Sequence, residues 1–312
     1  MNEEKIISPT KVALMVVYNH RFDKNIPIVE RLYKARFSHI YHLVPFYDAH
    51  IVDANVIPVY GCSHYFQGYI SQAYTHLKHV GFTHFFIIAD DLILNPRLNE
   101  QNLWEQIGIQ QGDCFLPTEL IVLQTLNRFW HHFIDAMRYK PRKKGLEANT
   151  VLPSVEQARS IFQSYRIPTG PISFSTLFSS WKMLRNLLRK RIFHRHLSYP
   201  LVGGYSDTFI MPAKYMEKFC TLCGFFSATD LFVELAIPTA MVLTNAPIKF
   251  NSDAKLHNGA YWGKGATYWK NPISEIESYG NNLNHLLKEF PADKFFVHPV
   301  KLSKWEWKAY QD

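Results

Sequence analysis

The amino-terminal part of the chain alternates between short apolar segments and segments of helical periodicity, and this alternation limits the fold most strongly. Apolar and β-branched segments predict strands at residues 11–18, 39–46, 54–60 and 82–89. Between them, residues 27–36 and 68–79 have the apolar spacing of helices. Strands that alternate with helices predict a mostly parallel sheet with right-handed crossovers. We therefore expect an α/β, Rossmann-like fold with helices flanking a central sheet.

The predicted strand at residues 82–89 ends at two adjacent carboxylates, Asp90 and Asp91, after which the chain becomes apolar again. Ligands of such sheets bind beyond the carboxyl ends of the strands, so the pair marks a candidate site. Neighbouring carboxylates repel each other unless a cation lies beside them, and their oxygen atoms suit a hard divalent metal. The alternative is a structural one, an Asp-rich turn or helix cap before Asn95 and Pro96.

The composition is that of a folded protein with a positive net charge. Of the 312 residues, 47% are hydrophobic and 15% aromatic, which suits a large core and excludes a disordered chain. Lys and Arg number 34 against 26 Asp and Glu, giving a formal net charge of +8. This charge favours phosphates, acidic sugars or an anionic membrane surface as partners. No nucleic-acid-binding motif is present, so no nucleic acid is expected as a partner.

No export signal or membrane span is predicted. The first residues are acidic where a signal peptide would be basic. The longest apolar region, residues 220–243, is interrupted by Asp230, Glu234 and Pro238. Four cysteines are too few for a disulfide scaffold in a chain of this length. We expect a cytoplasmic protein, or one bound peripherally to the inner face of the membrane.

The middle of the chain is strongly basic. Eight Lys and Arg residues and no acid lie between Glu156 and Asp207. Residues 181–193 have the pattern of a basic amphipathic helix, with apolar side chains that include Trp181 and Leu188 on one face. Such a helix binds an anionic membrane or an acidic partner, or it is an ordinary surface helix that packs on a core. The sequence leaves both interpretations open.

The part after residue 200 is again regular. Residues 202–211 predict a turn into a strand, and residues 212–219 predict a helix that starts at Pro212. A second helix is expected at residues 231–236, capped by Ser227 or Thr229, which would place Asp230 in its first turn. A carboxylate there is either a functional group or simply a favourable helix start.

The order of these parts resembles nucleotide-sugar-dependent glycosyltransferases of the GT-A fold. In that family, the fourth strand ends in an Asp-x-Asp motif that holds Mn²⁺ or Mg²⁺ against the donor diphosphate. The resemblance implies that Asp91 is a metal ligand and that Asp90 takes the middle position of the motif, while Ala89 departs from its first position. It also implies that Asp230 is the catalytic base, although Thr229 replaces the usual Glu. A late His completes the family's metal site, and His257 follows Asp230 by 27 residues (257 − 230).

The same resemblance points to the residues that bind the nucleotide. The family places the nucleotide over the end of the first strand and nearby loops, which implies Tyr18, Asn19 and Arg21 here. An aromatic ring can stack on a base and Asn can read its edge, but Tyr18 can equally belong to the core and Asn19 to a turn. Lys264, between Gly263 and Gly265, is a candidate for a phosphate contact.

The expected organisation is one GT-A-like domain in three parts. Residues 1–102 are the nucleotide-sugar-binding half, residues 103–200 are a basic, mainly helical insertion or acceptor region, and residues 201–312 are the acceptor-binding half with a carboxyl-terminal metal and phosphate loop. The expected function is metal-assisted glycosyl transfer to a glycan or lipid-linked acceptor, as in bacterial capsule or lipopolysaccharide synthesis. The alternatives are a sugar-nucleotide nucleotidyltransferase and a non-catalytic protein that binds polyanions or membranes.

Overall fold

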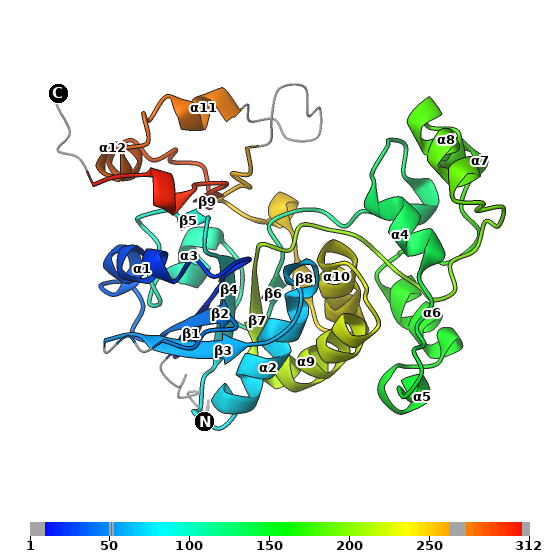
Figure 1. Ribbon diagram of the computed structural model, residues 1–312, viewed down its shortest axis with the longest axis horizontal. Coiled ribbons are helices and arrows are strands. Elements are labelled where there is room, and N and C mark those ends of the chain that lie inside the picture. The colour runs from blue at the N-terminus through cyan, green and yellow to red at the C-terminus, as the bar shows by residue number, and fades with distance from the viewer. Residues whose placement is uncertain (1–9, 50, 52, 262–272, 308–312) are drawn as a thin grey trace, which may run out of the picture.

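The computed structural model describes residues 10–49, 51, 53–261 and 273–307 (Figure 1). Among these residues, the central sheet has seven strands in the order β3-β2-β1-β4-β7-β6-β8. β1 pairs in parallel with β2 and β4, and β2 pairs in parallel with β3. β7 is antiparallel to β4 and β6, and β8 is parallel to β6. The strands are β1 (Val12–Val17), β2 (Ile40–Pro45), β3 (Asn55–Val59), β4 (His84–Ala89), β6 (Cys114–Phe115), β7 (Thr208–Pro212) and β8 (Ile248–Lys249).

The predicted α/β fold with a mostly parallel sheet is confirmed. Each of the four predicted amino-terminal strands is found, with ends within about two residues of the expected ones. β5 (Ile93–Leu94) and β9 (Phe296–Val297) form a separate antiparallel pair, which connects the segment after β4 to the carboxyl-terminal region. This pair brings residues far apart in sequence to the same edge of the central sheet.

The sheet is buried on both faces, and side chains of β1 alternate between two cores. Ala13 and Met15 belong to one core, and Leu14 and Val16 belong to the other. The first core is covered by α2 (Gln67–Leu77), α9 (Ala213–Ala228) and α10 (Val233–Leu243). The second is covered by α1 (Ile26–Tyr33), α3 (Leu103–Ile107) and α12 (Leu283–Lys288), with α11 (Ile273–Glu277) at its margin. Burial on both faces explains why these strands are continuously apolar.

The helical middle of the chain lies to one side of α9 and α10, away from β1, β2 and β3 (Figure 1). α4 and α6 pack on α10, and α5 packs on α9. Two elements of the predicted insertion, α3 and β6, belong instead to the central part of the molecule. Within the described residues, no helix has both the length and the apolar content needed to cross a membrane. The helices concerned are α4 (His132–Arg138), α5 (Ala148–Val151), α6 (Val155–Ser164), α7 (Phe174–Leu177) and α8 (Trp181–Arg189).

Candidate functional site

Asp90 and Asp91 lie directly beyond β4, at the edge where the parallel strands β1 and β4 end. The Asp90 backbone N–H donates to the Val17 carbonyl over 3.0 Å, so the ladder between the two strands continues to this point. Both side chains are buried, with 5% and 7% of their residue surfaces exposed. The sequence prediction for the position of this pair therefore agrees with the structure.

Asp91 is held by two cationic groups from the carboxyl-terminal region. His298 Nε2 lies 3.0 Å from Asp91 Oδ1, and the Lys301 ammonium donates to Asp91 Oδ2. Burial alone would raise the pKa of Asp91, but His298 and Lys301 outweigh it and hold the pKa well below its usual range. Asp91 is therefore an ionised carboxylate whose charge is balanced by groups of the chain itself.

Asp90 has the opposite electrostatic character. Burial and the neighbouring charge of Asp91 raise the pKa of Asp90 to about 7, although hydrogen bonds from the Asn25 side chain and the Asn19 backbone oppose the rise. Near neutral pH, Asp90 is thus close to half protonated while Asp91 is fully ionised. The adjacent carboxylates consequently differ in how readily they hold a proton.

His298 connects Asp91 to a further carboxylate. Its Nε2 lies 3.9 Å from Asp207 Oδ2, and the backbone carbonyl of Asp207 accepts from the Ala89 N–H over 2.7 Å. Burial disfavours the charged form of His298, but Asp91 and Asp207 outweigh it and raise its pKa. Burial also raises the pKa of Asp207, against the effect of His298. His298 accordingly links Asp91, beyond the end of β4, to Asp207, before the start of β7, and both carboxylates favour its protonated form.

Glu234, in the first turn of α10, interacts electrostatically with Asp207. Burial, followed by the charge of Asp207, raises the pKa of Glu234 to about 8, and a hydrogen bond from Trp130 opposes this. The Glu234 carbonyl accepts from the Gly204 N–H over 2.9 Å. A Cβ at Gly203 would lie 2.4 Å from the Trp130 ring, so this position requires glycine for the loop to pass the indole. The loop before β7 thereby brings Glu234 and Trp130 together.

The nucleotide-binding residues expected at the end of β1 surround the same edge. Tyr18 is fully buried, and its hydroxyl lies 2.9 Å from His42 Nδ1. This agrees with the interpretation of Tyr18 as a core residue. Asn19 contributes its backbone N–H to Asp90. Arg21 is exposed and pairs with Asp48, a residue that follows β2. The structure thus places Asn19 and Arg21 near the carboxyl ends of β1 and β2, and their contact with a nucleotide stays a prediction.

The predicted position of Asp230 in the first turn of a helix is wrong. α9 continues to Ala228 because its apolar residues remain buried, and Thr229 Oγ1 donates back to the Phe225 carbonyl over 2.9 Å, ending that helix instead of starting the next. Asp230 follows in a left-handed turn with φ of 59°, and α10 begins only at Val233. Its side chain is 56% exposed and pairs with Lys143 over 2.8 Å.

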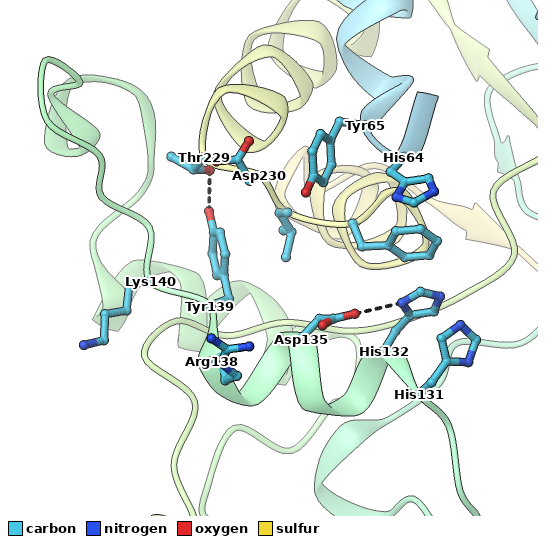
Figure 2. Close-up of a pocket in the computed structure, with 12 residues that line it drawn as sticks. His64, Tyr65, His131, His132, Asp135, Arg138, Tyr139, Lys140, Thr229 and Asp230 are labelled. Atoms are coloured by element: carbon cyan, nitrogen blue, oxygen red, sulfur yellow. Dashed lines mark hydrogen bonds and ion pairs between the residues drawn. The ribbon is translucent and has the colours of Figure 1, made fainter. Parts of the chain in front are cut away.

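Asp230 lines a pocket of about 850 Å³ between α4 and the turn that joins α9 to α10 (Figure 2). Figure 2 shows Asp135 and Arg138 from α4, and Tyr139 directly after it, opposite Thr229 and Asp230, with His64 and Tyr65 on a third side. The ring of His132 stacks on Phe232, with centroids 3.5 Å apart. The pocket therefore combines aromatic surfaces, which suit the apolar faces of a sugar, with charged and hydroxyl groups that can bind its hydroxyls.

The chain connects this pocket to the buried carboxylates. Phe232, at the pocket, is two residues before Glu234, and His131, also at the pocket, directly follows Trp130. The Ser206 hydroxyl donates to the Val233 carbonyl over 3.2 Å, which ties the start of α10 to the loop before β7. Glu234, which interacts with Asp207, thus follows closely in the chain after residues that line the pocket.

The predicted metal ligands are not brought together as expected. His257 is exposed, and its backbone pairs with Asp293 and Phe295; the imidazole that contacts Asp91 is that of His298. Among the described residues, no group of three or more His, Cys, Asp or Glu side chains is arranged to hold a metal ion. His298 and Lys301 contact the two oxygen atoms of Asp91 in this arrangement. Metal dependence stays a prediction, and Lys264 lies outside the described residues.

His298, Lys301, Asp207 and Glu234 are the site residues that the sequence interpretation missed. One signal was available: the apolar residues Phe295–Val297 end at a polar residue, just as β4 ends at its carboxylates. For Lys301, which lies 210 positions after Asp91, no local pattern reveals the pairing. Glu234 was noted only as an interruption of an apolar region.

Comparisons with known proteins establish no family for this chain. No family model matches the chain, and no curated protein matches it. Among solved structures, the chain is similar to the mannosyltransferase Ktr4p from S. cerevisiae in complex with GDP, with 10% sequence identity and a TM-score of 0.36. The match covers 80% of this chain and 70% of that one. At this identity and TM-score, the similarity does not establish a shared activity.

Proposed function

We propose that the protein is a glycosyltransferase that moves a sugar from a nucleotide-sugar donor to a glycan or lipid-linked acceptor. The observation that carries this proposal is the group of Asp90, Asp91, His298 and Lys301 at the carboxyl edge of β1 and β4. This edge is where α/β sheets bind nucleotides. A setting in bacterial surface polysaccharide synthesis stays an expectation of the sequence.

Lys301 gives this edge a cation that a donor diphosphate can reach. Its side chain is 60% exposed although its ammonium contacts the buried Asp91. An ammonium has three donor positions, so Lys301 can keep Asp91 and still donate to a phosphate oxygen. Held there, it would stabilise the charge that develops on the leaving nucleoside diphosphate.

The pocket beside α4 is proposed to bind the acceptor, and Glu234 to take the proton of the attacking hydroxyl. In the transfer step, the acceptor oxygen forms a bond to the anomeric carbon and the bond from that carbon to the diphosphate breaks. The hydroxyl proton moves to the Glu234 carboxylate, and the electron pair leaves with the nucleoside diphosphate. Glu234 is preferred because it interacts with Asp207, which in turn interacts with His298 and Asp91, whereas Asp230 is paired with Lys143.

The first experiment is a measurement of the melting temperature with UDP, GDP, CMP and dTDP, each with Mn²⁺ and with EDTA. A ligand that binds only the folded state raises the melting temperature by mass action. We expect one nucleoside diphosphate to raise it, and Lys301→Gln to reduce that rise. Lys304→Gln is the matched control, because Lys304 is exposed on the same segment.

The two alternative functions give different results in the same assay. A nucleotidyltransferase would respond to nucleoside triphosphates more than to diphosphates. A non-catalytic polyanion-binding protein would respond to all the nucleotides weakly and to the same extent, with strong salt dependence. If no nucleotide changes the melting temperature of the wild-type protein, the proposed donor site is wrong.

A further inference from the structure

The basic middle of the chain carries a group of large apolar side chains that the fold leaves uncovered. Of the ten most exposed large hydrophobic residues among those described, five lie between residues 174 and 193. We call these five the exposed apolar patch. Its members, with their exposed fractions, are Phe174 60%, Phe178 61%, Trp181 74%, Leu188 54% and Phe193 78%.

The patch is not the face by which α8 packs on the protein. Met183 and Leu187, which are four residues apart, are buried and attach α8 to the core. Trp181 and Leu188 are seven residues apart and share a different face, which points to solvent. α8 therefore has two apolar stripes, and only one of them has a partner in the described structure. Figure 1 shows α7 and α8 at the end of the molecule farthest from β1 and β2.

Cationic side chains are interspersed with the patch. The sequence from residue 157 to residue 206 contains no Asp or Glu. Around the patch, Arg195 lies over the Phe174 ring at 3.9 Å, and Arg185 is exposed on α8. The exposed cations on α8 and the turn after it are Lys182, Arg185, Arg189, Lys190 and Arg191. A partner that matches this surface presents a dense layer of anions next to an apolar phase.

We propose that α7, α8 and the turn to Phe193 bind the surface of an anionic lipid bilayer. Aromatic side chains favour the boundary between lipid headgroups and acyl chains, where their rings leave water. Lys and Arg beside them are attracted by the negative surface potential of acidic lipids. A bilayer supplies both an apolar phase and a layer of negative charge, which together match the patch and its cations.

Docking would also orient the pocket that is proposed to bind the acceptor. α7 is attached to the segment before α4, because the Gln124 carbonyl accepts from the Ser173 backbone N–H over 3.0 Å and from the Thr176 hydroxyl over 3.2 Å. α4 in turn lines the pocket. A membrane-bound α7–α8 region would hold the pocket close to the lipid surface, where a lipid-linked acceptor is found. The membrane proposal itself does not require that the protein transfers sugars.

The test is co-sedimentation of the full chain with vesicles of phosphatidylcholine alone and of phosphatidylcholine mixed with phosphatidylglycerol. We expect binding only to the mixed vesicles, with an affinity that falls as salt is added. Replacing Lys182, Arg185 and Arg189 together by Gln should weaken binding about 100-fold, or about fivefold for each cation. Replacing Phe178, Trp181 and Phe193 together by Ser should abolish it.

The controls separate membrane binding from loss of structure and from self-association. All three aromatic side chains are more than half exposed, so the triple Ser variant should keep the wild-type melting temperature. Replacing Phe46 and Tyr60 by Ser removes two aromatic residues elsewhere that are 59% and 60% exposed, and should leave vesicle binding unchanged. The proposal is overturned if the wild type does not bind mixed vesicles, or if both Ser variants lose binding equally. It is also overturned if the patch variant instead converts a dimer to a monomer in gel filtration.

Discussion

Asp90 and Asp91 are adjacent and chemically identical, yet the structure predicts that the same substitution changes stability in opposite directions. The pKa of Asp90 is about 7, against 3.8 in an unfolded chain, a difference equivalent to about 4 kcal/mol. Because the folded value is raised, the unfolded chain loses this proton first, and the stability of the wild type falls as pH rises from about 4 to about 7. Asp90→Asn stays neutral and keeps an acceptor for Asn19 and Asn25. It should therefore raise the unfolding free energy above about pH 7 by up to about 4 kcal/mol.

Asp91→Asn should instead destabilise the protein. The pKa of Asp91 lies well below its usual range, so its ionised form contributes stability above about pH 4 that is lost only as pH falls through the low folded value. Removing the charge leaves the cations His298 and Lys301 without the buried carboxylate that they contact. Breaking such a buried pair costs about 3 kcal/mol or more, partly reduced here because Lys301 is 60% exposed.

Urea unfolding followed by tryptophan fluorescence at about pH 4.5 and about pH 8 tests both signs. We expect Asp90→Asn to exceed the wild type by only about 1 kcal/mol at the lower pH and by considerably more at the higher one, with Asp91→Asn less stable at both. Asp53→Asn is the matched control, because Asp53 is exposed and should show neither effect. If Asp90→Asn is less stable than the wild type at the higher pH, the electrostatic difference assigned to the two carboxylates is refuted.

Two further predictions concern the base, and a third concerns the packing of Gly259 against Phe296. Glu234→Gln should lower kcat about 10²–10⁴-fold, whereas Asp230→Asn should mainly raise KM for the acceptor; steady-state kinetics that show the reverse would return the role of base to Asp230. The rate of transfer should rise with pH, with a midpoint at about 8, the pKa of Glu234. Trp130→Phe should move this midpoint to higher pH, because the indole hydrogen bond lowers the pKa of Glu234. Gly259→Ala would put a Cβ 1.5 Å from the Phe296 carbonyl oxygen and should lower the unfolding free energy by about 3 kcal/mol, measurable by urea titration.

The sequence predicted the long central strands of the sheet because these strands are buried on both faces. A strand covered on both sides is continuously apolar, so β1, β2 and β4 are visible as runs of apolar residues, and the carboxylates after β4 are visible as the point where such a run stops. The order of strands and helices then predicts a mostly parallel sheet. The short strands β6 and β8, of two residues each, have no such pattern and were not predicted.

The partners of the carboxylates were beyond the sequence for a different reason. His298 follows Asp91 by 207 positions, and the contact depends on the pairing of β5 with β9 and on the backbone pairing of residue 260 with residue 298. The segment that contains His257 contributes the backbone pairing of Ala260 with His298, and a role of the His257 side chain stays a prediction. Asp230 was misplaced because local capping preferences suggested a helix start, while burial of the apolar residues of α9 decided where the helices end.

The donor diphosphate could be neutralised by a divalent ion bound to Asp91 or by Lys301 itself. Lys301 contacts Asp91, so variants of these two residues distinguish the two accounts. If Asp91 binds a divalent ion that holds the diphosphate, Asp91→Asn should abolish nucleotide binding, and EDTA should do the same to the wild type. If Lys301 makes the phosphate contact, Asp91→Asn removes the carboxylate that competes with the phosphate for the Lys301 ammonium. Nucleotide binding in EDTA should then be equal or tighter, even though the fold is less stable. Lys301→Gln should then weaken binding in both backgrounds. Isothermal titration with the nucleotide identified by melting, in EDTA and in Mn²⁺, separates the accounts, because only the first predicts that binding disappears together with the carboxylate.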